Sequence, residues 1–195
     1  FIAANNFRGT HDIKFAVVRY GNVMGSRGSV IPFFIEKKKS GTLPVTDKRM
    51  TRFNITLQEG VDFVLESFNR MWGGELFVPK IPSFRILDLA EAIAPGCKIE
   101  EVGIRPGEKI HEEMITEADA MSTIEFEKYF VILPSVQLGD TEQLKLWNTE
   151  KFRTSSNSVQ GKFCKDNFKY NSGTNEWFLD VKELRDLIDK NVIGD

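Results

Sequence analysis

The sequence predicts an α/β fold from three observations: a short apolar run, a glycine-rich loop directly after it, and later segments whose apolar residues repeat at helical spacing. Residues 13–18 (IKFAVV) are apolar on both faces, as expected for a strand buried in a parallel sheet. Three glycines and two serines in residues 19–29 then require a loop. Ligands of open α/β sheets bind at the carboxyl ends of strands, so this loop is the first place to look for function.

The first predicted helix spans residues 30–39. Ser29 stands where an N-cap residue is needed, and Pro32 is tolerated because it falls in the first turn. Ser40 and Gly41 end the helix, since glycine readily takes the left-handed conformation that follows many helices.

A second helix is predicted after Thr56, because Thr56 and Glu59 have the spacing of a capping box. Apolar residues then follow at helical spacing and predict an apolar face made of Leu57, Val61, Val64, Leu65 and Phe68. The pair Gly73-Gly74 ends this helix.

Strands and helices continue to alternate up to residue 133. The pattern predicts strands over 75–78, 98–104 and 129–133, and helices over 86–94 and 118–123. From about residue 134 to residue 175 the pattern dissolves, which predicts an irregular excursion. A second capping box, Asp180 and Glu183, begins a last helix whose apolar residues share one face: Val181, Leu184, Leu187 and Ile188.

Composition excludes several classes of protein. Among 195 residues, 26 are Lys or Arg and 28 are Asp or Glu, and this net charge of −2 argues against a nucleic-acid partner. No apolar run approaches the roughly 20 residues that cross a bilayer, and we expect no membrane partner. Two cysteines do not make a disulfide framework, which favours a reducing compartment and a cytoplasmic protein. With only two histidines as well, we expect no metal site.

Three loops carry arginines and are the candidates for chemistry. Residues 19–29 offer backbone amides, two Arg side chains and a helix N-terminus, which together suit an anion, although a plain glycine-rich turn would look the same. Residues 46–53 hold three cations, either as a phosphate clamp or as a solvated charged turn. Residues 104–113 form a Pro-Gly turn whose Arg and Glu face either a ligand or each other. The residues alone therefore suggest a phosphorylated ligand and name no reaction.

At these loops the chain resembles the C-terminal part of the extended short-chain dehydrogenase/reductase family. Within that family it is most similar to the inverting UDP-N-acetylglucosamine 4,6-dehydratases. The stretches that carry the resemblance are residues 17–34 (VVRYGNVMGSRGSVIPFF), 43–65, 73–95, 103–115 (GIRPGEKIHEEMI) and 170–185. Residues 77–83 (FVPKIPS) mark the subfamily.

The resemblance implies an extended Rossmann-like fold with a smaller substrate-binding α/β region. Residues 1–40 would end the dinucleotide-binding domain, and residues 41–195 would bind the nucleotide sugar. It also implies an NADP-dependent lyase, with NAD as the alternative cofactor. Hydride leaves the sugar C4, the C5 proton and the C6 hydroxyl are lost, hydride returns to C6, and C5 is reprotonated with inversion. The enzymes that the chain resembles begin pseudaminic acid synthesis, and either flagellin glycosylation or a surface polysaccharide could lie downstream.

The resemblance assigns binding residues by their place in matched motifs. Val30 and Thr46 would lie near the nucleotide, Arg52 and Arg105 would hold the diphosphate, Glu108 would hold the uridine ribose, and Asn22 would touch the pyrophosphate or the sugar. The cofactor would contact Tyr20, Gly21, Asn22, Val23, Met24, Gly25, Ser26 and Arg27. The family's catalytic residues lie upstream of Phe1, so we expect none in this chain, no turnover by it alone, and a homo-oligomer when complete.

Other functions stay open from the sequence. A different nucleotide-sugar epimerase or dehydratase would share the arginine loops. A UDP-sugar-binding module without catalysis would share them as well. A role without any phosphorylated ligand is the plainest alternative.

Overall fold

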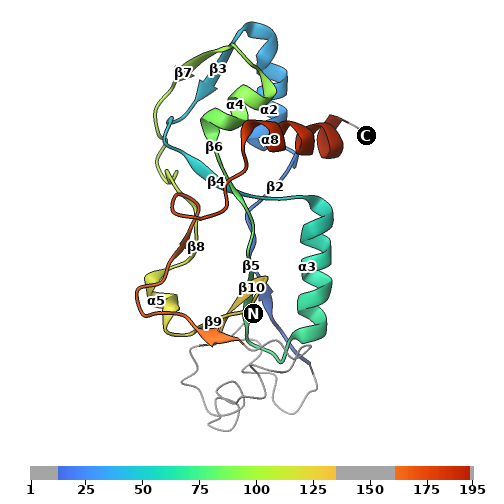
Figure 1. Ribbon diagram of the computed structural model, residues 1–195, viewed down its shortest axis with the longest axis vertical. Coiled ribbons are helices and arrows are strands. Elements are labelled where there is room, and N and C mark those ends of the chain that lie inside the picture. Colours follow the sequence, from blue (N-terminus) through green and yellow to red (C-terminus); the bar gives the residue numbers. More distant parts are fainter. Residues whose placement is uncertain (1–12, 135–160, 194–195) are drawn as a thin grey trace. The chain divides into compact units, whose positions relative to one another are not determined.

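The computed structural model describes residues 13–134 and 161–193 of the chain, and it is a mixed α/β structure as predicted (Figure 1). Its residues group into two compact units. Among the described residues, the first unit holds 13–20, 61–80, 114–134 and 161–169, and the second holds 21–60, 81–113 and 170–193. The domain boundary that the resemblance implies after residue 40 concerns a whole enzyme and stays a prediction.

The first unit is built on a five-stranded sheet in the order β1-β5-β10-β9-β11. Its strands are β1 (Val17–Val18), β5 (Leu76–Pro79), β9 (Thr123–Glu125), β10 (Tyr129–Ile132) and β11 (Lys162–Phe163). β1 and β5 run parallel, whereas the other pairs are antiparallel. A short helix, α5 (Glu117–Ala120), precedes β9. The core that this sheet covers is mostly aromatic: Phe63, Phe77, Ile124, Phe126, Tyr129 and Val131.

The second unit carries the predicted site and has two small sheets. β2 (Asn22–Val23), β4 (Thr51–Ile55) and β6 (Ser83–Arg85) form one sheet with β4 in the middle, parallel to β2 and antiparallel to β6. β3 (Thr42–Val45) and β7 (Lys98–Glu101) form a parallel pair. Helices α2 (Val30–Lys37), α4 (Ile86–Ile93) and α8 (Val181–Ile188) share one core with these strands, which includes Phe34, Leu43, Leu89 and Leu184.

The first predicted helix is found, but its expected cap is not. α2 starts at Val30 and ends at Lys37, a 3₁₀ turn, η1 (Lys38–Ser40), follows, and Gly41 is left-handed with φ 72°. Ser29 is at the N-cap position, yet its Oγ is buried and makes no hydrogen bond within the described part of the chain. An N-cap side chain bonds the second or third helical amide, and here the third position is Pro32, which has none.

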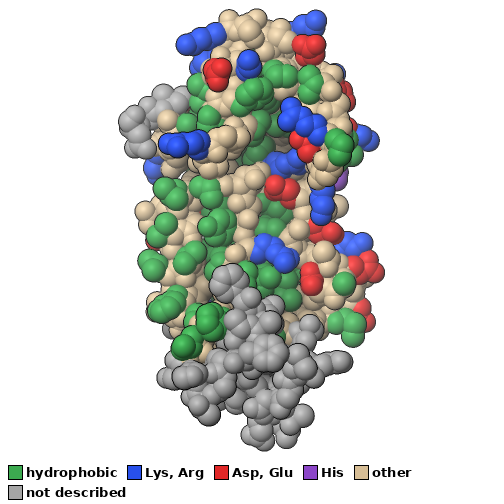
Figure 2. All heavy atoms as spheres, turned by 180° about the vertical axis from the view of Figure 1, so that it is seen from behind, with side chains coloured by type: hydrophobic (Ala, Val, Ile, Leu, Met, Phe, Trp, Pro, Cys, Tyr) green, Lys and Arg blue, Asp and Glu red, His purple; other side chains and the backbone are tan. Residues whose placement is uncertain are grey.

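The second predicted helix is α3 (Leu57–Arg70), and its capping box is confirmed. Thr56 Oγ1 accepts from the Glu59 backbone N–H at 3.2 Å, and Glu59 Oε2 accepts from the Thr56 N–H at 2.8 Å. The apolar face is not buried, however. Gly60, Phe63 and Ser67 face the core, whereas the predicted apolar residues are exposed by 41% (Val64) to 69% (Leu57). Hydrophobic side chains at intervals along α3 are visible in Figure 2.

The other predicted elements are present with shifted ends. The strand expected over 13–18 is limited to β1, the one over 98–104 ends at Glu101, and the helix over 118–123 is α5, after which Thr123 already belongs to β9. Strands β3, β4 and β6 were not predicted, and residues 51–53 belong to β4 rather than to a loop. Of the predicted irregular excursion, 135–160 lie outside the described residues. The rest contains β11 and β12 (Tyr170–Asn171).

Candidate functional site

Strand β4 connects two of the three predicted loops. On one side it pairs with β2, where Asn22 lies opposite Asn54, and the Met24 N–H donates to the Ile55 carbonyl at 2.8 Å. Near the start of the strand, its Thr51 N–H donates to the carbonyl of Ile110 at 3.1 Å. The loop after β2 and the segment after the Pro-Gly turn are therefore both attached to the same strand.

The glycines of the first loop have different reasons to be glycine. A Cβ on Gly21 would overlap Phe53 of β4, so the close approach of β2 and β4 requires its absence. Gly25 has φ 70° and Gly28 has φ 78°, and both are left-handed. Gly25 also lies against Val192, whose Cγ2 would be 2.8 Å from an added Cβ, whereas nothing lies within 4 Å of a Cβ on Gly28.

Two of the three cations in residues 46–53, Lys48 and Arg49, lie beside carboxylates of the chain itself. Asp47 accepts from Arg49 Nε at 3.0 Å and NH2 at 2.6 Å, and it also accepts from the Arg49 backbone N–H at 2.8 Å. These hydrogen bonds from Arg49 lower the pKa of Asp47 to about 2. Lys48 Nζ lies 3.9 Å from the Glu101 carboxylate. Arg49 and Lys48 are therefore poor candidates for a phosphate clamp.

Arg52 points inward from β4 and is held on several sides. Its NH1 donates to the carbonyls of Thr51 at 2.7 Å and Ile110 at 3.0 Å, and its NH2 donates to the Met50 sulfur at 3.4 Å. Nε lies 3.7 Å from Oε1 of Glu112. Arg52 therefore ties β4 to residues 110–112, and 20% of its side chain stays exposed for contact with a ligand.

Hydrogen bonds before and within the turn around Arg105 hold it in place. Before it, the N–H groups of Val102 and Gly103 donate to the carbonyls of Val45 and Thr46 at 2.9 and 3.1 Å. Within it, Glu108 Oε2 accepts from the Arg105 N–H at 3.2 Å, and the Glu108 N–H donates back to the Arg105 carbonyl at 3.0 Å. The Arg105 side chain is exposed, and its guanidinium has no hydrogen bond or ion pair with any described residue.

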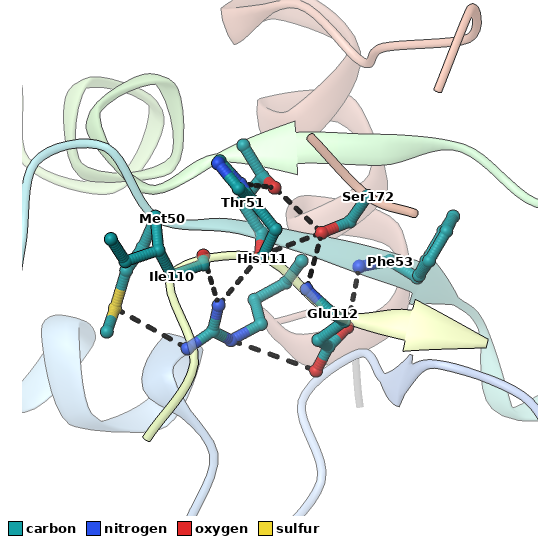
Figure 3. Close-up of polar contacts among 8 residues, drawn as sticks. Met50, Thr51, Phe53, Ile110, His111, Glu112 and Ser172 are labelled. Atoms are coloured by element: carbon teal, nitrogen blue, oxygen red, sulfur yellow. Dashed lines mark hydrogen bonds and ion pairs between the residues drawn. The ribbon is translucent and has the colours of Figure 1, made fainter. Parts of the chain in front are cut away.

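A hydroxyl network that no sequence motif indicated holds this region together. Ser172 is fully buried, and its Oγ lies 2.7 Å from Thr51 Oγ1 and accepts from the Glu112 N–H at 2.8 Å. Thr51 Oγ1 lies 2.9 Å from Nδ1 of His111. Figure 3 shows these side chains gathered over β4. Ser172 is 121 residues from Thr51 in sequence, so only the folded chain reveals this contact.

The structure brings some of the predicted site residues together and leaves others apart. Asn22 and Arg52 both lie near Glu112: Arg52 Nε is 3.7 Å from Oε1, and both side chains favour the charged form of the carboxylate, which lowers its pKa. Thr46 lies at the base of the Arg105 turn. Val30 is half buried at the start of α2 and packs against the core. Tyr20 belongs to the other unit, so its place relative to this group is not assigned.

No group of three or more His, Cys, Asp or Glu residues that could hold a metal ion occurs in residues 13–134 and 161–193. Within the same residues, no helix combines the length and the apolar character that crossing a membrane needs. Cys97 and Cys164 are both free thiols.

Comparisons with known proteins agree with the motifs. The model of the polysaccharide biosynthesis protein family matches residues 1–134. The inverting UDP-N-acetylglucosamine 4,6-dehydratase of Campylobacter jejuni (strain 81-176) is 48% identical over 190 residues, which are 96% of this chain and 55% of that protein. This identity confirms the resemblance on which the site residues were assigned.

Two further relatives are more distant. The UDP-glucose 4-epimerase of Rickettsia canadensis is 38% identical over 136 residues, which cover 67% of this chain and 40% of that protein. The X-ray structure of Pen from Bacillus thuringiensis superposes on this chain with a TM-score of 0.76 at 32% sequence identity. The superposition covers 97% of this chain and 54% of the Pen chain. The chain thus spans about half the length of the curated relatives it matches. Because the family model matches residues 1–134 and the fold is shared, the chain belongs to the polysaccharide biosynthesis protein family.

Proposed function

We propose that this chain is the substrate-binding part of a nucleotide-sugar dehydratase that acts on UDP-N-acetylglucosamine. The product would be a UDP-2-acetamido-2,6-dideoxy-4-keto-hexose with inverted C5. The observation that carries the proposal is the 48% identity, over 96% of the chain, to an inverting dehydratase of this substrate. The geometry supports it, because the second unit presents Arg105, whose guanidinium has no partner among the described residues, on a hydrogen-bonded turn beside the Glu108 carboxylate.

Arg105 and Glu108 would hold two neighbouring parts of the uridine diphosphate, the diphosphate and the ribose. The Arg105 guanidinium is exposed and unpaired among the described residues, and a planar guanidinium suits two phosphate oxygens. Glu108 uses Oε2 for the Arg105 N–H, which leaves Oε1 to accept from ribose hydroxyls. Because the turn is attached to β3 and β4, little ordering is needed when the ligand arrives.

Arg52, Asn22, Thr46 and Val30 would complete the nucleotide-sugar site. Arg52 is held by the carbonyls of Thr51 and Ile110 and lies 3.7 Å from the Glu112 carboxylate, near which the Asn22 side chain also lies. Thr46 is fixed to the base of the Arg105 turn through its carbonyl. We propose that Arg52 reaches the diphosphate, Asn22 the pyrophosphate or the sugar, and Thr46 and Val30 the nucleotide.

For the cofactor we propose NADP, with NAD as the alternative, held in part by residues 20–27. The loop fits a phosphorylated, planar group, since small residues keep its backbone accessible and Arg27 is exposed with no ion pair among the described residues. When bound, the nicotinamide would take a hydride from the sugar and return it. The chain's own residues would orient the sugar beside it, and we propose no catalytic acid or base among them.

Several finer features remain part of this proposal. We propose that the complete enzyme is a homo-oligomer of the cytoplasm that serves pseudaminic acid synthesis. We also expect the 195 residues alone to be without dehydratase turnover, which an assay of the isolated chain would test.

A 4-epimerase is the second candidate, because Rickettsia UDP-glucose 4-epimerases are 38–40% identical over 67% of the chain. An epimerase would return a sugar that keeps its C6 hydroxyl. Mass spectrometry of the product separates the two, since dehydration removes one water.

The binding assignment is tested by replacing Arg105 with Ala in the full-length protein. Loss of a charge-assisted contact of about 1.5–3 kcal/mol should raise the Kd for UDP tenfold or more by calorimetry. Lys109→Ala is the matched control, because Lys109 is an exposed cation in the same segment to which we give no role. An unchanged Kd in Arg105→Ala would contradict the assignment. A wild-type protein that binds no UDP would contradict the proposed function itself.

A further inference from the structure

The carboxylate of Glu112 lies where three parts of the second unit meet. Oε2 accepts the backbone N–H of Phe53 on β4 at 2.9 Å. Oε1 lies 3.7 Å from Arg52 Nε, and the Asn22 side chain from β2 is near enough to favour the charged form of the carboxylate, which lowers the Glu112 pKa. Figure 3 shows the Glu112 carboxylate between the Phe53 amide and the guanidinium bound to Ile110 and Met50.

The backbone of Glu112 is fixed as firmly as its side chain. Its N–H donates to Ser172 Oγ at 2.8 Å, and its carbonyl accepts from the Ser172 N–H at 2.8 Å. Ser172 is fully buried and is itself bonded to Thr51. The position of the carboxylate is therefore set by the fold and does not depend on a bound ligand.

This carboxylate is kept at a cost to folding. Burial raises the pKa of Glu112 even though the Phe53 N–H, Arg52 and Asn22 all favour its charged form. For an acid with a raised pKa, ionisation weakens the folded state as the pH rises above the ordinary value. We therefore expect a neutral side chain of the same shape to fold no worse at neutral pH. The charge itself lies 3.7 Å from Nε of Arg52.

Most N–H donors of Arg52 already face partners in the protein. A guanidinium has five N–H donors, and the two on NH1 are taken by carbonyls while one on NH2 faces the Met50 sulfur. Nε faces Glu112. One N–H on NH2 is left for an anion, so the direction of the guanidinium decides whether this donor reaches a phosphate oxygen.

We propose that Glu112 is a positioning residue for the sugar nucleotide: it holds Arg52 in the arrangement that binds a nucleoside diphosphate. This inference rests on the proposed function of the same site. Glu112 itself touches no ligand and acts through the Arg52 side chain that it fixes.

The test compares Glu112→Gln with wild type in the full-length protein. Glutamine still accepts the Phe53 N–H but removes the charge opposite Arg52. The Kd for UDP and the KM for UDP-N-acetylglucosamine should rise at least fivefold while kcat changes less than twofold, because the lost contacts serve ground state and transition state alike. The free energy of unfolding at pH 7 should not fall. Glu113→Gln, the same change one residue along, is the control and should leave all four values unchanged.

A double variant shows whether Glu112 acts through Arg52. Glu112→Gln raises the Kd for UDP by some factor in wild type. In the Arg52→Ala background, the same change should raise the Kd by a factor at least three times smaller. The proposal is overturned if Glu112→Gln binds UDP as wild type does, if its stability falls together with its affinity, or if the two changes are additive. Failure of wild type to bind UDP would instead overturn the proposed function, and the role of Glu112 with it.

Discussion

The hydroxyl of Tyr170 bonds both backbone polar groups of Ile81: it accepts from the N–H at 2.9 Å and donates to the carbonyl at 2.9 Å. Ile81 is buried and lies in the FVPKIPS stretch, next to β6. Burial raises the pKa of Tyr170 to about 12, so its hydroxyl keeps the proton that it donates at any physiological pH. A side chain late in the chain thus holds the stretch that marks the subfamily.

Replacing Tyr170 with Phe should destabilise the full-length protein by about 1–3 kcal/mol, the cost of a buried polar group left without a partner. Asn175 Nδ2 also donates to the Ile81 carbonyl at 3.0 Å, so the N–H of Ile81 is the group that loses its partner. Urea denaturation monitored by circular dichroism measures the change. Tyr20→Phe, which alters an exposed tyrosine, should change stability little, and equal losses in the two variants would contradict this account.

Asp47, in the turn between β3 and β4, makes the stability of the fold depend on pH. Its pKa is lowered from 3.8 to about 2 by hydrogen bonds from Arg49, so the contribution to stability is complete above the unfolded value and disappears as the pH falls from 3.8 towards 2. In Asp47→Asn the difference in Tm from wild type should be constant above about pH 5 and should shrink at lower pH. Calorimetric scans across this range measure it. A difference that is independent of pH down to 2 would show that Asp47 does not titrate in this way.

Gly25 and Gly28 form a matched pair for testing the first loop. An alanine at either position would have to adopt the left-handed backbone conformation, which destabilises the folded state by roughly 1–2 kcal/mol. Gly25→Ala should lose more than Gly28→Ala, because its Cβ would lie 2.8 Å from Val192 Cγ2, whereas the space around Gly28 is open. Denaturation curves of the two variants test this order. Adding Val192→Ala to Gly25→Ala should recover the excess loss, and no recovery would exclude the contact as its cause.

Local signals in the sequence predicted local structure well. The capping boxes at Thr56–Glu59 and Asp180–Glu183 are both present, because each needs only residues three apart. Ser29 shows the limit of such signals. Its residue type and position fit an N-cap, but Pro32 removes one of the two amides it could bind, and no cap bond forms.

Strands with distant partners could not be predicted in the same way. The sequence of β4, TRFNI, does not clearly alternate between apolar and polar residues. The segment is a strand because it pairs with β2 and β6. The apolar residues of α3 show the reverse case: their spacing predicts a helix correctly, but not that the exposed side would be the more apolar one. Spacing along a chain identifies a face and does not say what covers it.

By itself, the sequence determined the α/β class, most helices, the arginine-bearing loops and, through its motifs, the family. These depend on short-range patterns that one chain displays openly. Only the tertiary structure decided which cations are free. Arg49 is paired with Asp47, and Arg52 is held by backbone carbonyls and Glu112. The guanidinium of Arg105 has no partner among the described residues. The reason is physical: the charge available to a ligand depends on which partners folding has brought within hydrogen-bond distance, and Ser172, which fixes Glu112, comes from 60 residues away.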